Sequence, residues 1–323
     1  MAQTGQVFEV HSGERLLAAA RRAGVWLPFE CGWGSCGTCK LGLVEGSADL
    51  LFPGAPSWSE RDERRQRILA CQSTPTSDLT IKPFRVSAEP APGLATRDEI
   101  AELIKIEPLG PDINRFVFRL DEPAHYLEGQ YACLDLGPRL RRCYSMEDLS
   151  GGDAVSFIAK RYDGGVGSNA LFALEPSARI SIEFPYGGMW IRSGGQPCVL
   201  VAGGTGISPI LAMVRRMVAT ADGRPVQVHY GAGSPDELVA WDELSELVAQ
   251  LPDATLVGTV VRPDPTWPGE TGLVTDSLRA CAPAWAEDTE VFMAGPPVMV
   301  DAVLGLLKES GVGMNRISYD RFG

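Results

Sequence analysis

Four cysteines in the first quarter of the chain have a spacing that could bind iron. Cys31, Cys36 and Cys39 form a C-x4-C-x2-C run, and Cys71 follows 32 positions later. This is the plant-type spacing that holds a 2Fe–2S cluster through four thiolates. Zinc sites favour two short pairs of ligands, whereas the fourth cysteine here stands alone. The pattern therefore favours the cluster over structural zinc or disulfides.

Small residues between these cysteines agree with that prediction. Gly32, Gly34, Ser35 and Gly37 let the backbone fold tightly and aim its N–H groups at sulfur, which stabilises negative charge. The sequence therefore predicts a one-electron carrier in this part of the chain.

A second set of residues contains a stretch that is suited to bind a phosphate. Arg142, Tyr144 and Ser145 stand at the end of a strand-like segment, and a glycine-rich stretch with Ser168 precedes a later helical pattern. Backbone N–H groups and the helix dipole favour an anion at such a position. Each signal is weak alone, because Ser168 also fits a simple N-cap and Tyr144 a buried strand residue.

A third set predicts a nucleotide-binding turn. An apolar strand leads into a glycine-rich turn, and Pro209 stands in the first turn of the helix that follows. Pro209 occupies the place of the third glycine of a G-x-G-x-x-G pattern, where proline is tolerated because its missing N–H has no intrahelical partner. The turn itself consists of Gly203, Gly204, Thr205 and Gly206.

The elements that must position these residues change in type along the chain. In the first 85 residues we expect a strand over 6–10, a helix over 14–23, and strands over 40–44 and 79–83. Residues 87–97 are rich in proline, alanine and glycine and indicate a linker.

Beyond the linker, short alternating strands predict an antiparallel barrel, at 116–120, 130–136, 155–160 and 179–184. From residue 195, apolar strands alternate with helices, which is typical of a parallel sheet. The predicted strands are 198–202, 226–230, 255–260 and 291–294, and the helices are 208–218 and 236–250.

Composition bounds the class of protein. The 323 residues, 45% hydrophobic and 22% charged, fit a soluble globular protein with more than one domain. A net charge of −12 argues against nucleic acid as a partner. The uncharged stretch 193–214 is too rich in glycine for a membrane span. The amino terminus shows no signal-peptide pattern, so we expect a cytoplasmic location.

Together, in this order along nearly the whole chain, the motifs resemble the ferredoxin–NADP reductase superfamily, in the branch with an amino-terminal plant-type ferredoxin domain. Reductase components of bacterial aromatic-ring dioxygenases and of toluene- or phenol-type monooxygenases belong to this branch. The resemblance implies a multidomain α+β and α/β chain: a β-grasp ferredoxin domain over 1–86, an antiparallel β-barrel that binds FAD over 98–194, and a parallel-sheet nucleotide domain over 195–323.

By the same resemblance, Arg142 would hold a flavin phosphate, Tyr144 would stack on the isoalloxazine ring, and Ser145 would hydrogen-bond near the flavin N5. The pyrophosphate would lie against Gly165, Gly167 and Ser168. The other FAD-binding residues would be Cys143, Ile158, Lys160 and Val166.

A second nucleotide segment is implied by Ala294, Gly295, Pro296 and Pro297, where most relatives have cysteine in place of Ala294. That departure leaves the alignment of the nicotinamide to packing. Asp320 would approach the flavin edge. Phe322 would cover the flavin until nicotinamide displaces it, although a terminal core anchor is the equal alternative.

The coenzyme is predicted from the residues that follow strand 226–230. A 2′-phosphate needs a cation at this place, whereas Asp236 and Glu237 make it acidic and many relatives have arginine near Gly233. The sequence therefore favours NADH.

The resemblance implies an NADH-dependent reductase that passes electrons through FAD to 2Fe–2S, and then to a Rieske-type ferredoxin or an oxygenase component of an aromatic-hydrocarbon hydroxylating system. Two alternatives stay open: a reductase for another acceptor, such as a deoxysugar dehydratase, and a non-catalytic redox sensor. The route needs no general base, so His11, His125 and His229 are expected to be surface or packing residues. Aromatic residues near the cluster, Trp26, Phe29 and Trp33, would shape docking or pack the core.

Overall fold

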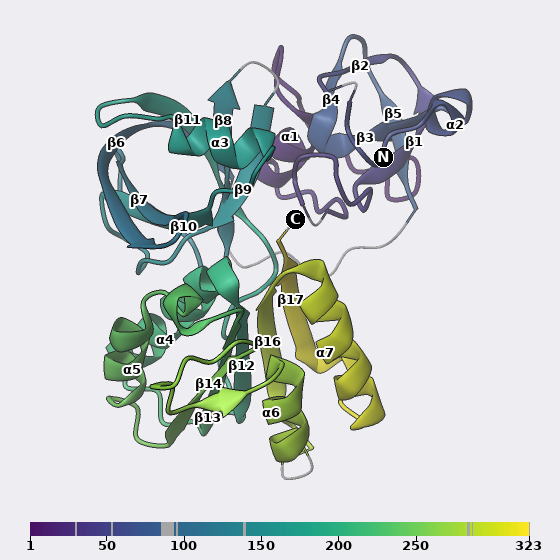
Figure 1. The fold of residues 1–323 in the computed structure, drawn as a ribbon. Coiled ribbons are helices and arrows are strands. Elements are labelled where there is room, and N and C mark those ends of the chain that lie inside the picture. Colours follow the sequence, from purple (N-terminus) through teal and green to yellow (C-terminus); the bar gives the residue numbers. More distant parts are fainter. Residues whose placement is uncertain are drawn as a thin grey trace. The chain divides into compact units, whose positions relative to one another are not determined.

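The computed structural model describes residues 1–29, 31–52, 54–84, 94, 96–137, 140–282, 285 and 287–322 (Figure 1). The chain forms two compact units. Unit 1 comprises Met1–Ile100, Ala132–Cys143 and Ile180–Tyr186, and unit 2 comprises Ala101–Tyr131, Tyr144–Arg179 and Gly187–Gly323. The predicted linker lies largely outside the described residues.

Unit 1 begins with a small mixed fold. Strand β1 pairs antiparallel with both β3 and β5, and β2 pairs antiparallel with β4. Helix α1 packs its leucines and alanines into the core of this fold. The bounds are α1 Leu16–Arg22, β1 Lys40–Glu45, β2 Ala48–Leu50, α2 Glu60–Arg64, β3 Arg67–Leu69, β4 Ser73–Pro75 and β5 Thr80–Pro83.

A six-stranded sheet of order β10-β7-β6-β11-β8-β9 follows, with β7 antiparallel to both β10 and β6. Fully buried Phe116, Phe118 and Phe157 fill its interior, and Phe116 lies opposite Phe157 in the ladder. The bounds are β6 Arg97–Gly110, β7 Ile113–Arg119, β8 Tyr131–Gly137, β9 Leu140–Ser145, β10 Ala154–Lys160, α3 Val166–Phe172 and β11 Arg179–Tyr186.

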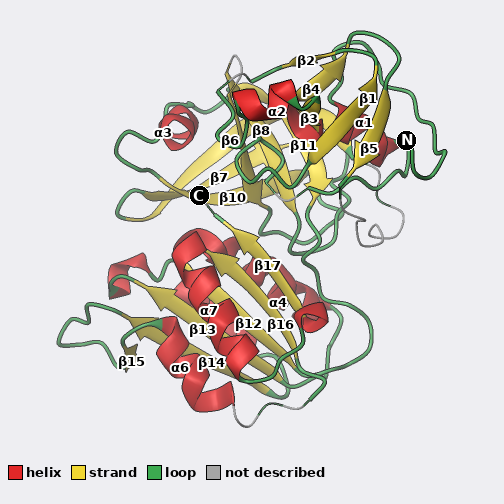
Figure 2. Cartoon of the chain, turned by 90° about the vertical axis from the view of Figure 1, so that its right-hand side faces the viewer, coloured by secondary structure: helices red, strands yellow, loops and turns green. Residues whose placement is uncertain are grey.

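The carboxyl-terminal part of unit 2 is a parallel sheet of order β15-β14-β13-β12-β16-β17. Helices α4 and α5 cover one face, and α6 and α7 the other (Figure 2). The bounds are β12 Cys198–Gly203, α4 Ile207–Ala219, β13 Val226–Ala232, α5 Trp241–Val248, β14 Ala254–Val260, β15 Glu270–Thr271, α6 Val274–Cys281, β16 Glu290–Gly295, α7 Pro297–Glu309 and β17 Ile317–Arg321.

Central strand β12 shows why this sheet is parallel and covered on both faces. All six of its residues are buried, with Leu200 in the core beneath α4 and Val201 in the core beneath α7. A strand of this kind has no polar face to offer to water, which agrees with its continuous apolar sequence.

Two predicted elements are wrong. Residues 6–10 form no strand, and Val7 is 90% exposed, because no neighbouring strand pairs with this segment. The helix predicted over 236–250 begins only at Trp241. Ala240, directly before the helix, has a left-handed backbone conformation (φ 55°), which prevents the helix from starting earlier. The Glu237 side chain is hydrogen-bonded to the Gly233 N–H and to Lys160.

None of the helices in the described part of the chain has both the length and the apolar content needed to span a bilayer.

Candidate cofactor-binding sites

The four cysteines predicted to bind iron come together as two pairs in unit 1. The Sγ atoms of Cys39 and Cys71 are 3.2 Å apart, and the side chains of Cys31 and Cys36 are hydrogen-bonded to each other. Cys71 lies on the 3-10 turn Ala70–Gln72, whose first N–H donates to the Cys39 carbonyl at 3.1 Å. A turn between two strands therefore brings the distant cysteine to the loop.

The paired arrangement fits a cluster of two irons better than a single metal ion. In a 2Fe–2S cluster held by four thiolates, each iron takes two of them. Across the described residues, no three His, Cys, Asp or Glu side chains are grouped closely enough to bind one ion together. The two thiol pairs agree with the binuclear core predicted from the sequence.

The loop aims backbone donors at sulfur, as its small residues predict. The N–H groups of Ser35 and Cys36 lie 3.2 and 3.4 Å from Cys31 Sγ, and that of Thr38 lies 3.4 Å from Cys36 Sγ. Hydrogen bonding with Cys31 lowers the pKa of Cys36 to about 6, so this sulfur is ionised at neutral pH. Iron needs that thiolate form.

Strand β9 carries Arg142 and Cys143 to the cysteine loop. The Cys143 thiol donates to the Cys31 carbonyl at 2.8 Å, and the Arg142 guanidinium lies 4.0 Å from the centroid of the Trp33 ring. The predicted flavin motif thus begins beside the predicted cluster site. Trp26 and Phe29 instead form an edge-to-face aromatic pair (ring centroids 5.8 Å apart), which favours core packing for these two residues.

Ser145 has the property expected of a residue that bonds a cofactor. It is 4% exposed, and its hydroxyl oxygen has no hydrogen-bond partner within the described residues. A buried hydroxyl without a partner is costly unless a bound group satisfies it. Tyr144, the preceding residue, lies half-buried with its ring 6.4 Å from that of Phe157.

Ser168 lies in the first turn of α3, as the sequence predicts. Its hydroxyl accepts from the Tyr162 N–H and donates to the Gly165 carbonyl, both at 3.2 Å, so the side chain shapes the turn. Val166 is 66% exposed at the start of this helix. The Ser168 hydroxyl is thus already bonded within the turn. The groups in this stretch that suit an anion are the backbone N–H groups of Gly165, Val166 and Gly167.

Two further predicted flavin residues have other partners. Ile158 is 4% exposed and belongs to the apolar core shared with α4. Lys160 forms an ion pair with Glu237, its Nζ 2.6 Å from Oε1. Both side chains therefore have partners within the chain.

The two predicted nucleotide segments meet at the carboxyl ends of β12 and β16. A Cβ at Gly206 would lie 2.0 Å from the Ala294 carbonyl oxygen, and a Cβ at Gly203 would lie 2.3 Å from Met299 Sδ. Glycine is required at Gly206 because the backbone at Ala294 already fills the space, whereas at Gly203 the obstacle is the flexible Met299 side chain. Pro209 is buried in the first turn of α4, as expected.

The carboxyl-terminal residues reach the same edge of the sheet through β17, a strand that the sequence analysis missed. Asp320 pairs with Ala294 in the parallel ladder, and the Phe322 N–H donates to the Gly295 carbonyl at 2.9 Å. The Phe322 side chain packs against the core beneath α4. The alternation of Ile317 and Tyr319 was the signal for this strand.

Arg262, at the end of β14, is also missed by sequence reasoning. Its N–H donates to the Gly233 carbonyl at 2.9 Å, and a Cβ at Gly233 would lie 2.9 Å from its Nη2. The Glu237 carboxylate accepts from the Gly233 N–H at 3.0 Å. The place predicted to be acidic therefore holds a cation and an anion together, because strands β13 and β14 end side by side.

Comparisons with known proteins agree with these three groups of residues. Residues 1–76 match the model of the 2Fe-2S iron-sulfur cluster binding domain, residues 100–190 that of the oxidoreductase FAD-binding domain, and residues 200–304 that of the oxidoreductase NAD-binding domain. The chain is 36% identical to the ferredoxin–NAD(+) reductase component of the alkene monooxygenase system of Xanthobacter autotrophicus, over 98% of each chain. The chain belongs to this reductase family.

Further relatives carry related names. The chain is 32% identical to ferredoxin–NAD(P)(+) reductase CarAd of Metapseudomonas resinovorans, over 96% of this chain and 95% of that protein. It is 33% identical to the reductase component of phenol 2-monooxygenase of a Pseudomonas species, over 99% and 92%. A solved ferredoxin reductase of carbazole 1,9a-dioxygenase superposes with a TM-score of 0.87 at 31% identity, over 99% and 97%.

The predicted family, fold class and set of cofactors are thereby confirmed. The chain is an oxidoreductase that transfers electrons from NADH through FAD to a 2Fe–2S cluster. When bound, FAD supplies the step between two-electron and one-electron transfer, which the polypeptide cannot perform. The residues of the chain bind and orient the three groups.

Proposed function

We propose that this reductase feeds a separate oxygenase of a hydrocarbon-hydroxylating system, either directly or through a Rieske-type ferredoxin. The names of the relatives support this, since they belong to alkene, phenol and carbazole oxygenase systems. The observation that carries the proposal is the hydrogen bond from Cys143 to Cys31, because it joins the flavin strand to the iron loop in one unit.

Within the flavin site, we propose that Arg142 binds a phosphate, Tyr144 stacks on the ring, and Ser145 bonds near N5. The partnerless, buried hydroxyl of Ser145 supports the last assignment. The backbone at Gly165, Val166, Gly167 and Ser168 would hold the pyrophosphate, and the β10 backbone at Ile158 and Lys160, with Cys143, would complete the site.

Within the nucleotide site, we propose that the turn from Gly203 to Gly206, followed by Pro209, binds the coenzyme together with residues 294–297. Asp320 and Phe322 would complete it at the flavin edge, since β17 brings them beside Ala294 and Gly295. The preference for NADH over NADPH remains a proposal. The Glu237 carboxylate beside Gly233 suits a ribose diol, and its charge is shared between Lys160 and Arg262.

The proposed domain boundaries are 1–86, 98–194 and 195–323, with 87–97 as a linker. The spans of the three matched family models lie inside these ranges, which supports them.

The decisive experiment separates the flavin from the cluster. In Cys36→Ser, reduction of cytochrome c should be abolished because the cluster loses a ligand, whereas ferricyanide, which draws directly on the flavin, should still be reduced. Cys281→Ser, which alters a half-buried thiol on α6, should behave as wild type. Both assays are run with NADH and with NADPH.

Loss of both activities in a folded Cys36→Ser protein would contradict a serial path from flavin to cluster. A higher kcat/KM for NADPH than for NADH would overturn the proposed coenzyme. A wild-type protein that binds NADH without steady turnover would indicate a redox sensor instead of a reductase.

A further inference from the structure

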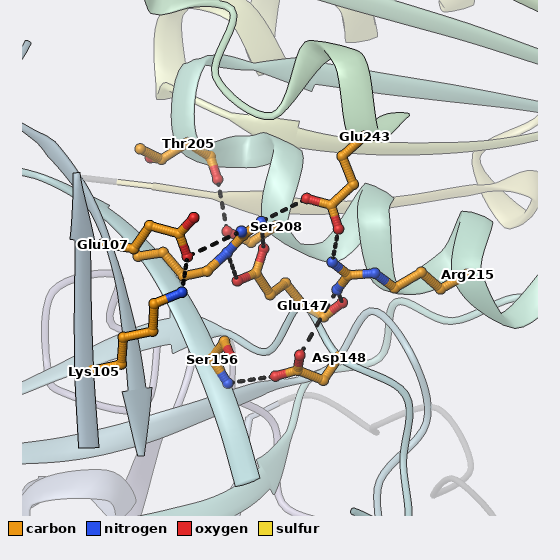
Figure 3. A network of polar contacts seen from close by, with 10 residues as sticks. Lys105, Glu107, Glu147, Asp148, Ser156, Thr205, Ser208, Arg215 and Glu243 are labelled. Carbon is orange, nitrogen blue, oxygen red and sulfur yellow. Dashed lines mark hydrogen bonds and ion pairs between the residues drawn. The ribbon is translucent and has the colours of Figure 1, made fainter. Parts of the chain in front are cut away.

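A ring of alternating charges lies in unit 2, outside the residues assigned to any cofactor. It consists of Arg115 on β7, Glu147 just after β9, Arg215 on α4 and Glu243 on α5, and is called the charge ring below. Figure 3 shows Arg215 directed at Glu243 and at the main chain of Glu147.

The contacts close on themselves. Arg115 forks onto Glu147, with Nε 2.6 Å from Oε1 and Nη2 3.2 Å from Oε2, and the same Nη2 lies 2.8 Å from Glu243 Oε2. Arg215 donates both to the Glu243 carboxylate and to the Glu147 backbone carbonyl. Four elements are thus tied at one point.

Burial makes this ring a device for orientation rather than for stability. Glu147 is fully buried, and the Arg115 and Arg215 side chains are 15% and 18% exposed. A buried ion pair gains little over apolar residues of the same size, but breaking it strands an uncompensated charge. The four elements can therefore leave this arrangement only at high cost.

Two of the elements joined by the charge ring, β9 and α4, adjoin the proposed flavin site and the proposed nucleotide site. Glu147 stands two residues beyond Ser145, and Arg215 lies on the helix that begins directly after the Gly204–Gly206 turn. In the same unit, Ile113 and Ile158 share one apolar core with Ile210 of α4. The elements next to Ser145 and the nucleotide turn are thus joined both by the charge ring and by a common apolar core.

We infer that Glu147 is a positioning residue: through Arg115, Glu243 and Arg215 it fixes the strand end that carries Ser145 relative to helix α4, and so sets how nicotinamide approaches the flavin. The inference rests on the proposed roles of Ser145 and of the Gly203–Gly206 turn. A displacement of about 1 Å between reacting groups lowers the rate about 10²-fold. The charge ring can therefore control the rate of hydride transfer although none of its residues contacts the reacting groups.

The charges around Glu147 give the joint a pH dependence. Burial raises the pKa of Glu147 to about 7 although Arg115 opposes this. Burial also opposes ionisation of Glu243, yet hydrogen bonds from Arg115 and Arg215 lower its pKa overall.

Other charged groups near the ring are Asp148, 3.8 Å from Arg215, and the Glu107–Lys105 pair of β6, with Glu107 3.6 Å from Arg115. The Tyr126 phenol also interacts electrostatically with Glu147 and Arg215. Among the residues of the charge ring, Glu147 is the one that takes up a proton nearest to neutral pH. Protonation weakens its two hydrogen bonds with Arg115.

The test is anaerobic reduction of the bound flavin by NADH, followed by stopped-flow absorbance from pH 5.5 to 8.5. In Glu147→Gln, the limiting rate at pH 8 should fall about 10- to 100-fold, with little change in NADH affinity and a full content of FAD. The wild-type rate should decline below about pH 7 towards that of the variant, whose own profile should lack this limb. Glu102→Gln, which removes an exposed partner of Arg119, is the matched control.

Binding of NAD+ to the oxidised protein, measured by spectral titration, provides a readout apart from turnover and should change less than two-fold. Glu243→Gln opens the ring at its most exposed member and should reproduce the slower reduction if Glu147→Gln fails to fold.

Reduction of folded Glu147→Gln or Glu243→Gln at the wild-type rate, with the wild-type pH profile, would overturn the inference. Wild-type flavin that NADH fails to reduce would instead contradict the proposed function itself.

Discussion

His229 shows what a single buried side chain contributes. It is 1% exposed on β13, with Nδ1 3.0 Å from Ser277 Oγ, and burial lowers its pKa to about 4. An unfolded chain takes up this proton near pH 6.5, whereas the folded chain resists it until about pH 4. The folded state therefore keeps its full stability above pH 6.5 and loses it as the pH falls towards 4, by at most about 3 kcal/mol.

Denaturant unfolding at pH 7 and pH 4.5 checks this expectation. The wild-type free energy of unfolding should fall by about 2 kcal/mol more than that of His229→Asn over this interval. An equal fall in both proteins would show that His229 does not drive the acid sensitivity. The packing role predicted for this histidine agrees with its burial.

At the residue scale, local spacing predicts only groups that act together along the chain. The cysteines were found because three of them share one short loop. Glu147 and Arg262 were missed because each is an ordinary charged residue in the sequence. Only the pairing of distant elements brings Glu147 to Arg115, or Arg262 to Gly233.

At the scale of elements, the turn between β12 and α4 packs so closely against the end of β16 that Gly206 has no room for a side chain. Gly206 has an ordinary backbone (φ −60°), so conformational freedom is not the reason for glycine here. In Gly206→Ala, the new methyl would collide with the Ala294 carbonyl and separate the turn from β16. The expected results are a loss of about 1–3 kcal/mol in unfolding free energy and markedly weaker NADH binding.

A matched control exists in α7, where a Cβ at Gly305 would meet no atom within 4 Å. Gly305→Ala should stabilise the protein by about 0.5–1 kcal/mol, because alanine is the better helix former. Thermal unfolding and NADH titration of both variants make the comparison. Wild-type affinity and stability in Gly206→Ala would show that the turn can move freely.

Hydrophobic periodicity in the sequence was sufficient to predict the helices and strands that bury one face or all of their side chains. It predicted β12, β13, β14 and α4 to within a few residues. It failed where tertiary bonds decide: Glu237 holds the segment before α5 out of the helix, and residues 6–10 find no strand to pair with.

For the whole molecule, the two compact units predict a local response to loss of iron. Without metal, the thiol pairs of unit 1 no longer cross-link the loop 31–39 to the turn Ala70–Gln72. Hydrogen exchange followed by mass spectrometry should quicken in these two segments, while β12 and α4 of unit 2 serve as internal controls and stay unchanged. FAD should remain bound. Uniform acceleration along the chain, or none at all, would contradict this division.

The order of the three predicted parts was readable from the sequence because each has its own pattern of strands and helices. The grouping of most of β8, β9 and β11 with the iron loop could not be predicted. It depends on contacts between segments more than 100 residues apart, such as Cys143 with Cys31, which leave no periodic trace.

The carbonyl of Ala294 above Gly206 also constrains how such proteins can diverge. The two turns cannot change independently: a bulkier residue in place of Gly206 is tolerated only if the backbone at Ala294 has already moved away. Substitutions in these two turns should therefore occur together during evolution. Replacing one turn alone with that of a distant homologue is the least promising way to alter the coenzyme preference.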